Sequence, residues 1–179
     1  MSESPPQSVA PASSPVPWRV GLGHDTHRLK PGLRLIIGGV EIPHEQGFVA
    51  HSDGDVLLHA ITDAVLGAAA LGDIGEWFPD TDPRYRGADS SLLLRDAVRV
   101  VREQGWCVVN VDCTVFAQRP KLSPYKREMA GNIARVLGIE ANCVNVKAKT
   151  GERVGPVGLE ESMDASAIVL LARVQPRTE

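Results

Sequence analysis

The feature that most limits how this chain can fold is a nearly apolar segment, residues 56–71, that carries one polar stripe. Asp55, His59 and Asp63 recur every four residues, and this spacing places side chains on one face of a helix. The other positions can be buried, so the segment predicts a core helix from about residue 53 to residue 71. A polar stripe on a buried helix costs folding free energy unless a partner engages it, and a metal ion is such a partner.

Local signals place both ends of this helix. Ser52 supplies a short side chain that can cap the first turn, and Asp55 places a carboxylate near its positive end. Gly72 supplies a C-terminal stop. The stretch His51-Ser52-Asp53-Gly54-Asp55 therefore delivers several polar side chains to the point at which the helix begins.

A second polar pair lies upstream, where Asp25 and His27 follow the predicted strand at 18–23. Residues two apart in an extended chain point to the same side, so these two side chains share a face. With His59 they offer one carboxylate oxygen and two imidazole nitrogens, and three protein ligands with an open fourth position are typical of a catalytic zinc. An Asp-x-His pair alone also occurs in surface turns, but the two pieces together favour a metal site.

Composition limits the class of protein. The 179 residues suffice for one domain with a core, and the formal net charge of −3 argues against a nucleic-acid binder, which would carry a basic surface. The three cysteines, Cys107, Cys113 and Cys143, form no C-x-x-C pair, and we interpret them as small buried residues of a reducing compartment. No segment is long and apolar enough to predict a membrane-spanning helix.

The first 17 residues are rich in Pro, Ser and Ala and contain no aromatic residue, which predicts a disordered N-terminal tail. They hold neither an apolar segment for secretion nor an arginine for organelle import, so we expect a cytoplasmic protein. The folded domain is expected to span residues 18–175, followed by a C-terminal tail at 176–179.

Apolar patterns predict the remaining elements. Residues 106–117 alternate most clearly, and their polar face, with Asn110, Asp112 and Thr114, could meet another subunit. The expected strands span 18–23, 33–40, 106–117, 144–148 and 162–174, and the expected helices span 53–71, 90–104 and 123–137. This order predicts an α+β fold, a two-layer single domain with helices packed on one side of a mixed β-sheet.

Two connections carry further expectations. The strands at 18–23 and 33–40 could pair as a long hairpin that turns at Lys30-Pro31-Gly32. The glycines, prolines and acids of residues 72–83 exclude regular structure and predict an irregular loop. Such a loop would cover a site or, alternatively, be an acidic surface loop held by Trp77.

Three motifs carry a resemblance to a known family: Gly-x-Gly-x-Asp-x-His at 21–27, His-Ser-Asp-Gly-Asp at 51–55, and His59. With them the chain resembles the 2-C-methyl-D-erythritol 2,4-cyclodiphosphate synthases of the non-mevalonate isoprenoid pathway. Further matching segments at 72–75, 78–82 and 118–121 extend the resemblance over about residues 19–173, which is the whole predicted domain.

The resemblance implies a phosphorus–oxygen lyase that converts 4-diphosphocytidyl-2-C-methyl-D-erythritol 2-phosphate to 2-C-methyl-D-erythritol 2,4-cyclodiphosphate and CMP. It implies a homotrimer whose sheets face the threefold axis and whose active sites lie between neighbouring subunits. Each site would hold one zinc ion on Asp25, His27 and His59. A second ion, magnesium or manganese, would bind the substrate diphosphate with the help of Glu152.

The same resemblance assigns substrate contacts to the other matched positions. His51 and Ser52 would hold the 2-phosphate, Asp73 and Gly75 would meet the ribose, and Thr150 would lie by the diphosphate. The residues expected to border the methylerythritol are Ile74, Phe78, Asp80 and Asp82. The backbone expected to enclose the cytosine runs through Ala117, Lys121, Leu122 and Ser123.

The chemistry of this reaction suits these residue types. A phosphate oxygen must attack a phosphorus that already carries negative charge, and cations held by carboxylates and imidazoles withdraw that charge. The substrate supplies its own nucleophile, so the site contributes orientation and electrostatic stabilisation. We expect His51 and Thr150 to be catalytic by stabilising charge in the transition state. Asp55 is expected to hydrogen-bond the free nitrogen of a ligating imidazole, to act as a helix-start carboxylate, or both.

The sequence departs from the family near its C-terminus. Lys149 and Gly151 replace two threonines, and Lys149 either meets a phosphate or faces solvent. Pro156 and Leu159 stand where relatives have a phenylalanine and an arginine that help line a prenyl-diphosphate cavity on the trimer axis. We therefore predict that this protein binds prenyl diphosphates weakly or not at all.

Two other functions compete with this one. A zinc-dependent phosphatase acting on a phosphorylated polyol would use the same metal and acids, although the nucleotide-binding segment at 117–123 favours the synthase. A non-catalytic trimer that keeps the fold as a scaffold is the third hypothesis, and the intact metal ligands argue against it.

Overall fold

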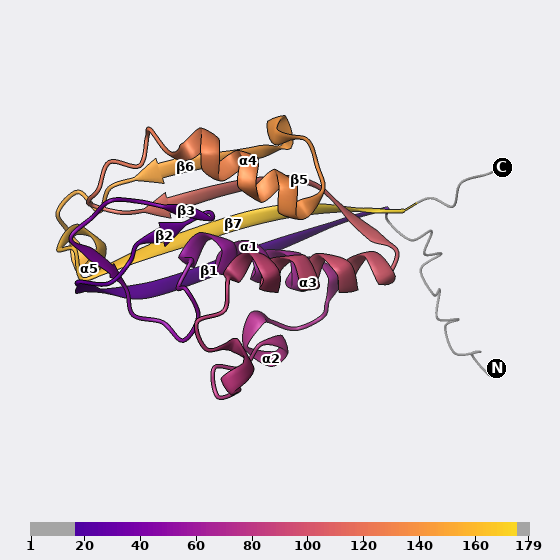
Figure 1. Ribbon diagram of the computed structural model, residues 1–179. Coiled ribbons are helices and arrows are strands. Elements are labelled where there is room, and N and C mark those ends of the chain that lie inside the picture. Colours follow the sequence, from indigo (N-terminus) through magenta and orange to yellow (C-terminus); the bar gives the residue numbers. More distant parts are fainter. Residues whose placement is uncertain (1–16, 175–179) are drawn as a thin grey trace, which may run out of the picture.

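A mixed five-stranded sheet forms one layer of the structure, a computed structural model that describes residues 17–174 (Figure 1). The strand order is β4-β1-β7-β5-β6, and every neighbouring pair is antiparallel except β5 and β6. The strands are β1 (Trp18–Pro31), β4 (Gln46–Phe48), β5 (Trp106–Phe116), β6 (Val144–Lys149) and β7 (Ser162–Arg173). Apart from Pro17, the predicted tails lie outside the described residues.

Three long helices, α1 (Val56–Ala69), α3 (Ser90–Glu103) and α4 (Lys126–Leu137), form a second layer on one face of this sheet (Figure 1). The shorter helical turns are α2 (Ile74–Trp77), η1 (Pro83–Tyr85), η2 (Ala141–Cys143) and α5 (Gly155–Gly158). The predicted α+β class with a mixed sheet is confirmed. None of the helices within residues 17–174 combines the length and the apolar character that spanning a bilayer requires.

The closest packing in the core joins β1 to α1. A Cβ atom on Gly21 would lie 1.9 Å from the carbonyl oxygen of Ala64, and one on Gly23 would lie 1.9 Å from that of Ala60. Only glycine allows the backbones of a strand and a helix to approach so closely. Asp25 follows on the same face of β1, so this contact places it beside the start of α1.

β1 is longer than the sequence predicts. It continues past Gly23 to Pro31 because residues 18–28 pair with β7 and residues 29–31 pair with β4. The alternating polar side chains after Gly23 hide this continuation, since no apolar pattern marks it. The polar pair Asp25 and His27 therefore lies within the strand and not after it.

The predicted strand at 33–40 and its long hairpin with β1 are wrong. Instead, β2 (Ile36–Ile37) and β3 (Val40–Glu41) form a separate two-stranded ribbon. Gly38 and Gly39 turn this ribbon with φ angles of 60° and 70°, which favour glycine. The partner of β1 at this edge is β4, a strand that the sequence did not predict.

The helix boundaries also differ from the prediction. α1 begins at Val56, and its N-terminal cap is Asp55, whose side chain accepts hydrogen bonds from Leu57 N and Leu58 N, so Ser52 is not the cap. The helix ends at Ala70 in a left-handed conformation, before the predicted stop. Residues 72–83 are not wholly irregular, because Asp73 caps the single turn of α2. The helix predicted from residue 123 begins at Lys126.

The sheet face away from the helices is open in the single chain. It presents large apolar side chains on β1 and β7: Val20 is 68% exposed, Leu22 69% and Ile168 49%. Leu22 pairs across the strands with Ile168, which in turn pairs with Asp112 of β5. The predicted polar face of β5 therefore belongs to the same open surface.

Candidate active site

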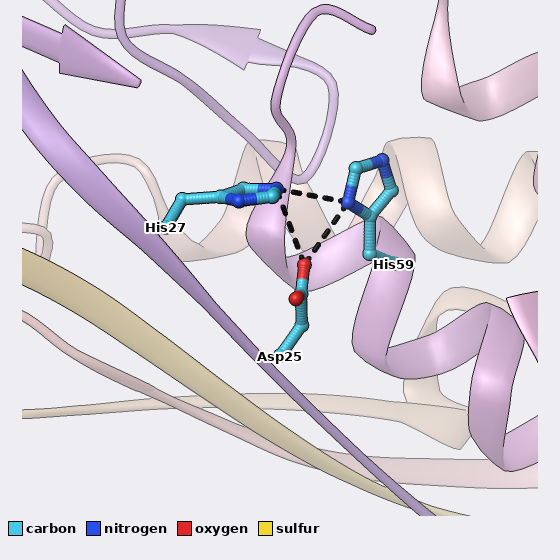
Figure 2. A group of neighbouring side chains, drawn as sticks. All are labelled: Asp25, His27 and His59. Atoms are coloured by element: carbon cyan, nitrogen blue, oxygen red, sulfur yellow. Dashed lines mark hydrogen bonds and ion pairs between the residues drawn. The ribbon is translucent and has the colours of Figure 1, made fainter. Parts of the chain in front are cut away.

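Three potential metal ligands meet where β1 passes the first turn of α1 (Figure 2). Asp25 and His27 project from the same face of β1, and His59 comes from α1. His59 Nδ1 lies 3.0 Å from Asp25 Oδ2 and 3.0 Å from His27 Nε2, and His27 Nε2 lies 3.2 Å from Asp25 Oδ2. The three side chains predicted from the sequence are therefore brought together.

The donor atoms fit a tetrahedral metal ion. Zinc lies ~2.0–2.1 Å from nitrogen and oxygen ligands, so a tetrahedral site separates its ligand atoms by ~3.3 Å. The three separations here, 3.0 to 3.2 Å, are close to that value. Two imidazole nitrogens and one carboxylate oxygen are also the ligand types of catalytic zinc sites that keep one position open.

The electrostatic environment of the cluster favours the protonation states in which these side chains bind a metal ion. Burial by itself would raise the pKa of Asp25, but the hydrogen bond from His59 and the charges of His27 and His59 hold that pKa below its usual value. Burial lowers the pKa of His27, although the charge of Asp25 opposes this. An ionised carboxylate and a neutral imidazole are the forms in which these groups bind metals.

A cavity of about 510 Å³ opens onto the three ligands. Nine of the predicted site residues line it: Asp25, His27, His51, Ser52, His59, Ile74, Gly75, Phe78 and Asp80. Asp63, one helical turn after His59, accepts a hydrogen bond from Ile74 N and so holds α2 at the cavity. The segment after α1 therefore contributes walls to a site, as one of the two predictions for it stated.

Two predicted residues lie beside this cavity without lining it. Asp73 caps α2 by accepting from Glu76 N. Asp82 pairs with Arg84 at 2.6 Å, and its carbonyl oxygen lies 3.3 Å from His51 Nε2. Hydrogen bonding to Arg84 lowers the pKa of Asp82. The backbone carbonyl of Asp82 can therefore orient His51, while the carboxylate of Asp82 pairs with Arg84.

The remaining predicted residues gather around a second cavity of about 500 Å³. Its lining includes Ala117, Lys121, Leu122, Ser123, Lys149 and Thr150. Thr150 Oγ1 donates a hydrogen bond to Glu152 Oε1 at 2.5 Å, so Glu152 stands next to this group. The two cavities share no lining residue, and within one chain the predicted site is thus split into two halves.

The role expected of Asp55 beside a ligating imidazole is wrong. Its carboxylate is fully buried and accepts from the backbone N–H groups of Gly38, Gly39, Leu57 and Leu58. Burial raises its pKa to about 6, and these backbone hydrogen bonds oppose the rise. Asp55 is the helix-start carboxylate of the other expectation, and it also fastens the β2–β3 turn to α1.

The free nitrogen of His59 has a different partner, which the sequence did not indicate. His59 Nε2 lies 2.8 Å from Ser90 Oγ, and Ser90 contacts the carboxylate of Asp53. Ser90 has the pattern of an ordinary helix start, and it lies 37 residues from Asp53 in sequence. No local spacing connects residues so far apart, so only the fold reveals this contact.

The sequence of this chain matches a known protein family and its named members. The model of the YgbB family matches residues 18–172. The protein named 2-C-methyl-D-erythritol 2,4-cyclodiphosphate synthase from Dechloromonas aromatica is 59% identical over 157 residues, which cover 88% of this chain and 98% of that protein.

Solved structures agree with this match. The bifunctional IspDF of Campylobacter jejuni has a TM-score of 0.85 and 44% identity over 88% of this chain, which corresponds to 43% of that longer protein. The CDP complex of IspF from Plasmodium falciparum has a TM-score of 0.78 and 34% identity, and the match covers 88% of this chain and 97% of that one.

Proposed function

Because this chain belongs to the YgbB family, we propose that it converts 4-diphosphocytidyl-2-C-methyl-D-erythritol 2-phosphate to 2-C-methyl-D-erythritol 2,4-cyclodiphosphate and CMP. The reaction is an intramolecular attack of the 2-phosphate on the β-phosphate, and it serves isoprenoid precursor biosynthesis. The observation that carries the proposal is the cluster of Asp25, His27 and His59, which lines a cavity in a chain that belongs to this family.

The chemistry needs a cation at the reacting phosphates, and the cluster can supply it. A zinc ion held by Asp25, His27 and His59 would withdraw negative charge from the phosphoryl oxygens. His51 and Ser52 line the same cavity, where an imidazole and a hydroxyl can hold the 2-phosphate in line for attack. We assign His51 the further task of stabilising charge in the transition state.

The walls of the first cavity suit the polyol part of the substrate. Phe78 and Ile74 offer apolar surface to the methyl group, and Asp80 offers an acceptor to a hydroxyl group. Asp82 lies beside the cavity, where its carbonyl oxygen is 3.3 Å from His51 Nε2. Gly75 lies at the cavity in α2, and Asp73 begins that turn, so both can reach the ribose. α2 would thus be the link between the polyol and the nucleoside.

We assign the second cavity to the cytidine diphosphate part. The segment from Ala117 to Ser123 offers backbone donors and acceptors to the base, and Lys149 and Thr150 stand where the phosphates would enter. Glu152 beside Thr150 is the ligand that we propose for a magnesium or manganese ion on the diphosphate. The relative from Plasmodium falciparum was solved with CDP bound, which supports a nucleotide site in this fold.

We propose that the enzyme is a homotrimer in which each site lies between neighbouring subunits. The two cavities of one chain share no lining residue, so one substrate would be held by the first cavity of one subunit and the second cavity of its neighbour. The exposed apolar side chains on the outer face of the sheet, Val20, Leu22 and Ile168, supply the surface that would be buried around the threefold axis.

Product analysis tests the proposal. Purified protein supplied with substrate, zinc and magnesium should release CMP and a cyclic diphosphate, both resolved by ³¹P nuclear magnetic resonance. The phosphatase hypothesis requires inorganic phosphate instead, and the names of the relatives do not favour it. A folded, metal-loaded protein that releases inorganic phosphate would overturn the proposal, and no turnover at all would support the scaffold hypothesis.

A further inference from the structure

The two ring nitrogens of His59 face different partners. Nδ1 lies 3.0 Å from Asp25 Oδ2, within the metal cluster. Nε2 points away from that cluster (Figure 2) and lies 2.8 Å from Ser90 Oγ, at the start of α3. A histidine binds a metal through an unprotonated nitrogen, so the position of the single proton on the neutral ring decides whether Nδ1 can serve.

Asp53 determines the direction in which the hydroxyl proton of Ser90 points. Ser90 Oγ donates to Asp53 Oδ1 at 2.5 Å, and Ser90 N donates to Asp53 Oδ2 at 3.1 Å. A hydroxyl has one proton, and a carboxylate offers only acceptors, so the proton of Ser90 is committed to Asp53. Ser90 Oγ can then meet His59 Nε2 only as an acceptor, which places a ring proton on Nε2 and makes Nδ1, the nitrogen that faces Asp25, the one that can give its lone pair to a metal ion.

The pair is held firmly in place. Ser90 is fully buried, and the backbone N–H of Asp53 donates to Ala88 O at 3.0 Å. Asp53 Oδ1 also accepts from Asp55 N at 3.2 Å, so the carboxylate joins the start of α1 to the start of α3. Ser52 Oγ lies 3.2 Å from His59 Nε2 and also accepts from Gly54 N. With the ring proton on Nε2, the second lone pair of Ser52 Oγ can serve as a longer acceptor for that proton.

We infer that Asp53 and Ser90 form a positioning pair that fixes the tautomer of His59 and thereby sets the affinity of the site for a divalent metal ion. The inference rests on the metal centre proposed above. Asp53 acts through Ser90 and not on the ion itself. Partners of this kind, behind a ligating histidine, commonly change metal affinity by about 10–100-fold when they are removed.

Metal affinity of the full-length protein tests the pair. The zinc dissociation constant is measured by competition with a chromophoric chelator. Ser90→Ala and Asp53→Asn should each weaken zinc binding by about 10–100-fold. The matched control is Asp89→Asn, because Asp89 lies next to Ser90 but its carboxylate accepts from Ser91 N at the helix start. Wild-type affinity in both Ser90→Ala and Asp53→Asn would overturn the inference.

The order of action within the pair is tested by the double variant. Asp53 hydrogen-bonds Ser90, which contacts His59, so adding Asp53→Asn to Ser90→Ala should weaken zinc binding by much less than the product of the two single losses. Independent losses that multiply in the double variant would show that Asp53 does not work through Ser90, and would overturn the inference.

The tautomer can be read directly in the metal-free wild-type protein, even if a variant fails to fold. ¹⁵N resonances of His59 should show a proton on Nε2, and a ring protonated on Nδ1 alone would overturn the inference. None of these measurements uses turnover. A protein that binds zinc through this pair but forms no cyclic product would therefore contradict the proposed function and leave the positioning pair standing.

Discussion

At the scale of single residues, the polar stripe of α1 is explained by three separate partners. Asp55 holds the β2–β3 turn, His59 contributes to the metal cluster, and Asp63 accepts from Ile74 N of α2. From the sequence we predicted that the polar side chains of this helix need a partner, and we proposed a metal ion. The sequence does not reveal that each of the three side chains has a different partner, because those partners lie in segments whose positions depend on the fold.

Asp55→Asn tests the structural role of the first of these residues. An amide nitrogen would face backbone N–H donors in a fully buried site, so at least one donor would lose its acceptor. We expect the free energy of unfolding in urea to fall by about 2–3 kcal/mol. Asp89→Asn, an exposed cap at the start of α3, should cost less than about 1 kcal/mol. Equal losses in the two variants would contradict this account.

At the scale of elements, the contact between β1 and α1 positions the site. The sequence predicted the core helix, the strands at 106–117, 144–148 and 162–174, and the layering of helices on a mixed sheet, because apolar periodicity records burial directly. It missed the polar second half of β1 and the β2–β3 ribbon, because strand pairing and glycine turns leave no apolar pattern. It also missed the contact of Ser90 with Asp53.

Gly23→Ala tests whether this close packing supports the metal cluster. The added Cβ would lie 1.9 Å from Ala60 O, so α1 must move away from β1. We expect a loss of about 3 kcal/mol in the free energy of unfolding, together with weaker zinc binding. The matched control is Gly67→Ala in α1, where a Cβ meets nothing within 4 Å and helix propensity predicts a gain of up to about 1 kcal/mol. Wild-type stability and zinc affinity in Gly23→Ala would refute the role of this contact.

At the scale of the whole molecule, the three candidate metal ligands lie together, whereas the substrate residues predicted from the sequence are divided between two cavities. Asp25, His27 and His59 meet within a single chain, and the cavity with Thr150 has a separate lining. Metal binding should therefore need only a folded chain, and turnover should need assembly of several chains.

Leu22→Glu tests this separation. Leu22 is 69% exposed on the outer sheet face, and charges placed around the proposed threefold axis should repel one another. We expect a folded monomer by light scattering that keeps its zinc but loses turnover by at least about 100-fold, since orientation between the two half-sites is lost. Leu92→Glu, at a 49% exposed position of α3, is the control and should remain trimeric and active. An active monomer would exclude a shared site.

The predicted loss of prenyl-diphosphate binding also belongs to the assembled molecule. Pro156 lies in α5, and Leu159 directly after it is 63% exposed in the single chain and carries no charge for a diphosphate. Calorimetric titration of the wild-type protein with geranyl diphosphate should give no measurable heat at micromolar ligand. Leu159→Arg should strengthen binding if the missing cation is the cause, and micromolar affinity of the wild type would contradict the prediction.

The most direct measurement is the metal content of the purified protein, determined by mass spectrometry beside its rate of CMP release. We expect one zinc ion per chain in the wild type. A His27→Ala, His59→Ala double variant should fold and should lose both the zinc and the formation of cyclic product. Zinc retained at one ion per chain in that variant, or undiminished CMP release without zinc, would contradict the central claim that these side chains hold the catalytic ion.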